Sequence, residues 1–64
     1  MSMSRKILIA DDDAAFLREA SLYIAGRGFA IIPVSDGYQA LEYAVRERPD
    51  LLILSLSVEL LGRP

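Results

Sequence analysis

Three consecutive carboxylates, Asp11-Asp12-Asp13, are the residues of this 64-residue chain best able to do chemistry. They follow directly on an apolar run, residues 7–10, that is typical of a strand buried on both faces. Because burying an unpaired carboxylate is costly, the triplet must lie at the end of that strand, where a parallel sheet opens into a ligand-binding crevice. One carboxylate can cap the following helix. The other two repel each other, which calls for a bound cation or a shared proton.

A second polar pair, Ser55 and Ser57, follows another apolar run, Leu51-Leu52-Ile53-Leu54. A serine nucleophile needs a base to take its proton, and the chain has no histidine. Lys6 lies at the far end of the first strand. We therefore interpret Ser55 as a small polar residue at a strand end, and we expect the chain not to be an enzyme.

The charge distribution excludes several classes of partner. The formal net charge is −2 and the seven basic residues are scattered, so nothing indicates a nucleic-acid footprint. No run reaches the roughly 18 apolar residues of a membrane span, and the first residues lack a secretory signal pattern. The sequence therefore predicts a cytoplasmic protein without a nucleic-acid or membrane partner. The apolar content of 53% is high for one small domain, so we expect part of the apolar surface to be covered by something else.

Hydrophobic periodicity predicts five elements within one small domain. They are strands at residues 5–10, 29–34 and 51–55, helices at 13–27 and 36–47, and a tail without clear periodicity at 56–64. Each helix carries an apolar stripe that should face the sheet. The stripes consist of Phe16, Leu17, Ala20, Tyr23 and Ile24 in the first helix, and of Tyr38, Leu41, Ala44 and Val45 in the second.

The order of these elements predicts an α/β fold, βαβαβ, with a parallel three-stranded sheet and right-handed crossovers. Pro33 cannot donate a hydrogen bond to a neighbouring strand, so the second strand belongs at a sheet edge and the strand order is 2-1-3. The carboxyl ends of the first and third strands are then neighbours. Asp11, Asp12, Ser55 and Ser57 should converge on one crevice.

Three segments in register carry a resemblance to a known family. They begin at Lys6 (KILIADDD), Ser35 (SDGYQALE) and Arg48 (RPDLLIL). Together they resemble the first half of a response-regulator receiver domain, the flavodoxin-like module of two-component signalling. The resemblance implies that Asp11 and Asp12 hold Mg²⁺ together with the backbone carbonyl of Ser57. It also implies that an aspartate ending the third strand accepts a phosphoryl group from a histidine kinase.

The sequence departs from that family at the reacting position. Ser55 stands where the family has its phosphoacceptor aspartate, and the 64 residues contain no counterpart of the family's fourth and fifth strands. We therefore expect a truncated receiver-like domain, a pseudo-receiver that binds proteins and binds Mg²⁺ weakly. The alternative is a fragment or variant of a phosphorylation-competent regulator. A nucleotide-binding half-domain is disfavoured, because no glycine-rich loop follows the first strand and the Asp triplet repels phosphates.

The third strand should also mediate self-association. Its apolar edge, Leu51 to Leu54, has no neighbour to satisfy its outer backbone groups and is a template for pairing with another chain. We expect a homodimer whose third strands meet antiparallel in a sheet of order 2-1-3-3-1-2. The alternative arrangement buries the helix faces and exchanges residues 58–64. A histidine kinase or another signalling protein is the expected partner outside the dimer.

Overall fold

The computed structural model describes residues 5–55. The elements are β1 (Lys6–Ala10), α1 (Ala14–Ala25), β2 (Ala30–Val34), α2 (Gly37–Glu47) and β3 (Leu51–Leu54). Every element lies within its predicted range and is shorter by one to three residues. The predicted tail at 56–64 lies outside the described residues.

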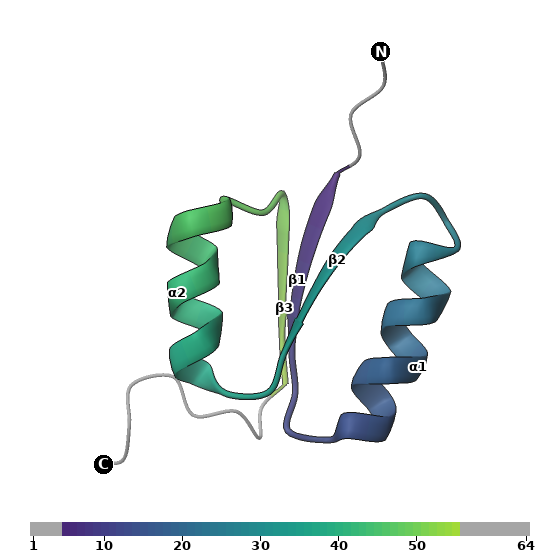
Figure 1. Ribbon diagram of the computed structural model, residues 1–64, viewed down its shortest axis with the longest axis horizontal. Coiled ribbons are helices and arrows are strands. Elements are labelled where there is room, and N and C mark those ends of the chain that lie inside the picture. The colour runs from purple at the N-terminus through teal and green to yellow at the C-terminus, as the bar shows by residue number, and fades with distance from the viewer. Residues whose placement is uncertain (1–4, 56–64) are drawn as a thin grey trace.

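The sheet is parallel with the order β2-β1-β3, as the sequence predicts. Pro33 lies on the edge strand β2 opposite Ile9, where its missing N–H costs no hydrogen bond within the sheet. The two helices lie on opposite sides of the sheet, so one helix covers each face (Figure 1). This arrangement follows from two right-handed crossovers that run in opposite directions along the sheet, from β1 to β2 and then from β2 past β1 to β3.

The central strand β1 forms the core. Its residues Ile7, Leu8, Ile9 and Ala10 are all buried. Leu8 and Ala10 belong to one cluster with residues of β2 and α2. Because side chains alternate along a strand, Ile7 and Ile9 face the opposite side, which α1 covers. The apolar run that precedes the Asp triplet is therefore buried on both faces.

Helix α1 begins one residue after its predicted start and ends two residues before its predicted end. The backbone N–H of Phe16 donates to the Asp13 carboxylate, which caps the helix. Leu17 is buried against the sheet, but Phe16 and Tyr23 remain 48% and 66% exposed. After the helix, Gly28 has φ 98°, a left-handed conformation that favours glycine.

Helix α2 faces the sheet with a different side from the predicted one. Gly37 and Ala40 are buried, whereas Tyr38, Leu41 and Val45 are exposed, so most of the predicted stripe is wrong. Because Gly37 and Ala40 are small, the helix backbone can lie close to the sheet. The bulky apolar residues of the predicted stripe then lie on the exposed sides of the helix. The helix ends at Glu47, as predicted, and its C-cap Arg48 adopts a left-handed conformation at φ 50°.

Polar contacts fix the start of β3 beside β1. The backbone N–H of Lys6 donates to the Asp50 carboxylate at 2.8 Å, and the Asp50 N–H donates to the Lys6 carbonyl at 2.8 Å. The Lys6 ammonium also pairs with Glu47 of α2 at 3.1 Å. Both side chains of this ion pair are partly exposed, so it contributes at most about 1 kcal/mol. Its main effect is to hold the end of α2 near the start of β1.

Leu8→Ala should lower the free energy of unfolding by roughly 3 kcal/mol, because Leu8 is fully buried between strands and helix. Leu22→Ala is the matched control, since Leu22 is 69% exposed and its truncation should change stability by less than about 0.5 kcal/mol. Urea denaturation at equal protein concentration measures both. Equal effects of the two substitutions would contradict the described core.

Candidate functional site

The carboxyl ends of the three strands meet at one edge of the sheet. The backbone N–H of Ser55 donates to the Ala10 carbonyl at 2.9 Å, and the Asp11 N–H donates to the Val34 carbonyl at 3.2 Å. The Asp triplet directly follows β1 and Ser55 directly follows β3, and the ends of these two strands are neighbours. The structure brings Asp11, Asp12 and Ser55 to one edge, as the strand order predicts. Ser57 lies outside the described residues.

The three carboxylates divide their roles along the β1–α1 loop. Asp13 caps α1, with its Oδ1 atom 3.1 Å from the backbone nitrogen of Phe16. Asp11 is half-buried, and its Oδ1 atom accepts a hydrogen bond from the Asp13 N–H at 2.9 Å. Asp12 is exposed. The hydrogen bond from Asp13 therefore orders the loop and holds the Asp11 carboxylate at the sheet edge.

The donor set at this edge consists of oxygen atoms, which suits a hard cation such as Mg²⁺. Asp11 and Asp12 would supply the two charged ligands. Within residues 5–55 no group of three Asp, Glu, His or Cys residues is placed to hold a metal ion.

Ser55 is half-buried at the end of β3. Activation of its hydroxyl as a nucleophile requires an adjacent base. The chain has no histidine, and the Lys6 ammonium lies at the opposite end of β1, where it pairs with Glu47. Neither a histidine nor Lys6 can therefore serve as that base.

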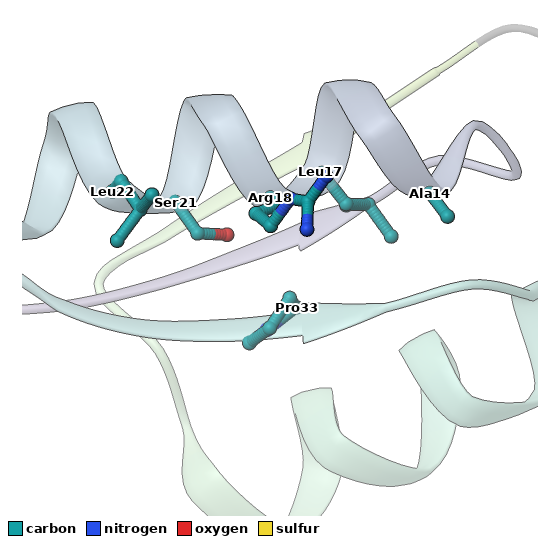
Figure 2. Close-up of a pocket in the computed structure, with 6 residues that line it drawn as sticks. All are labelled: Ala14, Leu17, Arg18, Ser21, Leu22 and Pro33. Atoms are coloured by element: carbon teal, nitrogen blue, oxygen red, sulfur yellow. The ribbon is translucent and has the colours of Figure 1, made fainter.

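The sequence analysis did not predict an apolar groove that lies beside the edge strand β2. It measures about 380 Å³ and lies between α1 and the edge strand β2 (Figure 2). Its lining residues are Ala14, Leu17, Arg18, Ser21, Leu22 and Pro33. The Ser21 hydroxyl is buried without a hydrogen-bond partner among the described residues. Small residues on α1 opposite a proline on the edge strand are the signal that could have indicated a gap.

Comparison with known proteins points to response regulators. The chain is 45% identical over 56 residues to the DNA-binding response regulator MtrA of Mycobacterium tuberculosis, covering 86% of this chain and 24% of MtrA. It is 35% identical over 54 residues to the alkaline phosphatase synthesis transcriptional regulatory protein PhoP of Bacillus subtilis, covering 84% of this chain and 22% of PhoP. It is also 35% identical over 51 residues to the response regulator MprA of Mycobacterium leprae, covering 80% of this chain and 22% of MprA.

The chain thus spans about a quarter of the length of these curated relatives. No family model matches it, and no solved structure gives a significant match. The named relatives and the sheet order β2-β1-β3 together support a receiver-like module related to response regulators of two-component signalling. Among the described residues, neither helix has the length and apolarity needed to cross a membrane.

Asp13→Ala should lower the free energy of unfolding by about 1 kcal/mol, because the first turn of α1 loses its capping acceptor. Asp13→Asn is the matched control, since an asparagine side chain can accept the same hydrogen bond and should cost much less. Thermal unfolding followed by circular dichroism compares the two at one protein concentration. Equal losses would show that the charge of Asp13, rather than its capping hydrogen bond, stabilises the fold.

Proposed function

We propose that this chain is a pseudo-receiver, a receiver-like module of two-component signalling that acts by protein binding without accepting a phosphoryl group. The observation that carries the proposal is the position of Ser55. Its backbone pairs with Ala10 at the end of β3, beside Asp11. By the resemblance to receiver domains, this is where the phosphoacceptor aspartate stands, and this chain presents a hydroxyl there.

The chemical difference between the two groups supports this reading. A carboxylate is ionised at neutral pH and can attack a phosphoryl group directly. A hydroxyl must first lose its proton to a base, and the chain has no histidine to serve as one. Ser55 keeps the strand-end geometry without the reacting group. We therefore propose no enzymatic activity for the chain.

A second candidate is a fragment or variant of a phosphorylation-competent regulator. Its support is the 45% identity to MtrA together with the adjacent carboxylates Asp11 and Asp12 at the sheet edge. In that case the module would accept its phosphoryl group from a histidine kinase. Under either candidate we propose a cytoplasmic signalling protein as partner. The DNA binding named for MtrA concerns a protein of which this chain matches 24%, and the net charge of −2 gives no reason to transfer it.

Incubation with acetyl phosphate and Mg²⁺ should leave the intact mass of the wild-type chain unchanged, because no carboxylate occupies the position of Ser55. Ser55→Asp restores a carboxylate there and adds negative charge beside Asp11. We expect it to lower the melting temperature in metal-free buffer and to be labelled poorly. Ser55→Ala is the control that removes the hydroxyl. A stable phosphoryl adduct on the wild-type chain that Ser55→Ala abolishes would contradict the pseudo-receiver proposal.

We further propose that Asp11 and Asp12 hold a divalent cation weakly, because two adjacent carboxylates at the sheet edge repel each other when no cation is bound. When bound, Mg²⁺ would offset that repulsion. The chain itself contributes the ordered loop, in which the N–H of Asp13 fixes Asp11.

Asp12→Asn should raise the melting temperature in metal-free buffer and abolish any stabilisation by Mg²⁺ at millimolar concentration. The measurement is a series of thermal melts with increasing Mg²⁺ at constant ionic strength. Glu19→Gln is the matched control, because Glu19 lies exposed on α1, outside the loop of the Asp triplet, and its loss should leave the response to Mg²⁺ unchanged. A wild-type melting temperature that does not respond to Mg²⁺ would remove the cation site.

A further inference from the structure

The groove between α1 and β2 has a lining that suits a ligand with an apolar part and a polar part. Four of its six lining residues are apolar, and the other two are Arg18 and Ser21. All six lie within residues 14–33, away from both ends of the described range. Its volume of about 380 Å³ is at the lower end of the range for small-molecule sites, which are mostly apolar with a few placed polar groups.

Small side chains opposite Pro33 leave this groove open. Val34 belongs to the core cluster on the α2 face, so by alternation the neighbouring Pro33 lies on the face that α1 covers. Ala14 and Ser21 line the α1 side of the groove and have too little volume to fill the space beside the proline ring. Leu17 is buried, so it lies on the inner side of the groove, toward the sheet.

The two polar groups of the groove have no partners within residues 5–55. The Ser21 hydroxyl is buried and makes no hydrogen bond. The Arg18 guanidinium makes no hydrogen bond or ion pair with any described residue. Figure 2 shows both side chains leaving α1 on the side that faces Pro33. Because a buried hydroxyl without a partner is unfavourable, a ligand that bonds it would be favoured.

The charge at this position is positive. The lining contains one arginine and no acidic residue. Glu19 is adjacent to Arg18 and two residues before Ser21, and residues one or two apart on a helix do not face each other. The Asp13 carboxylate accepts the N–H of Phe16 at the start of α1, more than one turn before Arg18. An anion at Arg18 therefore meets no acidic side chain of the groove.

We propose that the groove between α1 and β2 binds a small monocarboxylate that carries an apolar chain or ring. Arg18 and Ser21 are three residues apart on one face of α1, with Cβ atoms about 5–6 Å apart, so both can donate to one carboxylate group. Two donors match the two oxygens of a carboxylate better than the three oxygens and higher charge of a phosphate.

The apolar part of the ligand lies beside Leu17, Leu22 and the ring of Pro33. The lined stretch of α1, from Ala14 to Leu22, is about 12 Å long, which limits the ligand to medium size. Burial of the chain or ring against these side chains supplies most of the affinity, and the carboxylate fixes the orientation.

An NMR titration of the isotope-labelled 64-residue chain with octanoate tests the proposal. Octanoate should shift the methyl signals of Leu17 and Leu22 and saturate at millimolar concentration or below. Octanol has a similar apolar chain without the charge and should bind more weakly. No saturable shift with octanoate would overturn the proposal. Equal affinity for octanol would assign the groove to apolar groups in general, such as side chains of a partner protein, and would overturn it as well.

Arg18→Gln removes the charge and keeps much of the side chain. It should weaken octanoate binding about tenfold and leave octanol binding unchanged, because only the carboxylate loses a charge-assisted hydrogen bond. Arg27→Gln is the matched control, since Arg27 follows α1, donates to the Tyr23 hydroxyl and lies outside the groove. It should leave octanoate binding unchanged. Equal weakening by both variants would show a general attraction between the anion and the chain and would overturn the site.

Ser21→Ala tests the buried hydroxyl. It should weaken octanoate binding several-fold without lowering the melting temperature of the ligand-free chain, because the hydroxyl has no partner there. Ser21→Leu should fill the groove and exclude both ligands while the chain stays folded by circular dichroism. A Ser21→Ala or Ser21→Leu chain that binds octanoate like the wild type would overturn the proposal. None of these measurements involves Ser55, so the pseudo-receiver proposal stands or falls separately.

Discussion

Burial of β1 on both faces is the constraint on which the rest of the structure depends. An apolar strand can be buried this way only if a helix covers each face and another strand flanks each edge, and the chain supplies these in the order α1, β2, α2, β3. The same burial forces the charge of Asp11 out at the end of the strand, because a carboxylate cannot follow Ala10 into the core. The core thus determines where the polar edge lies, the carboxyl ends of the strands that carry Asp11, Asp12 and Ser55. Its chemistry depends on the residues that end the neighbouring strands.

The fold could be predicted from a few residues with strong conformational constraints. Pro33 placed β2 at an edge and so gave the strand order, and the Asp triplet located the start of α1 with Asp13 as its cap. These predictions succeed because their causes do not depend on the surrounding packing. A proline lacks the N–H that a central strand needs, and an unpaired carboxylate cannot be buried in the core.

The predictions that fail concern packing between elements. An apolar stripe such as Tyr38, Leu41 and Val45 shows that a helix is amphipathic, but Gly37 and Ala40 can approach the sheet more closely and determine which flank turns toward it. The groove beside Pro33 was not predicted for the same reason, since a gap depends on the volumes of residues from two elements. At the polar edge, adjacency of Asp11 and Ser55 followed from strand order, whereas the hydrogen bond that holds Asp11 depends on the conformation of the loop.

The two edges of the sheet differ in a way that links the fold to partner binding. On β2, the ring of Pro33 takes the place of one backbone donor, which discourages another strand from pairing there. On β3, all four side chains are apolar and partly exposed. Because Ser55 ends this same strand, any chain that pairs with β3 also borders the polar edge. The Ser55 N–H also bonds the Ala10 carbonyl, so a partner on β3 would contact the strand that positions Ser55 beside Asp11.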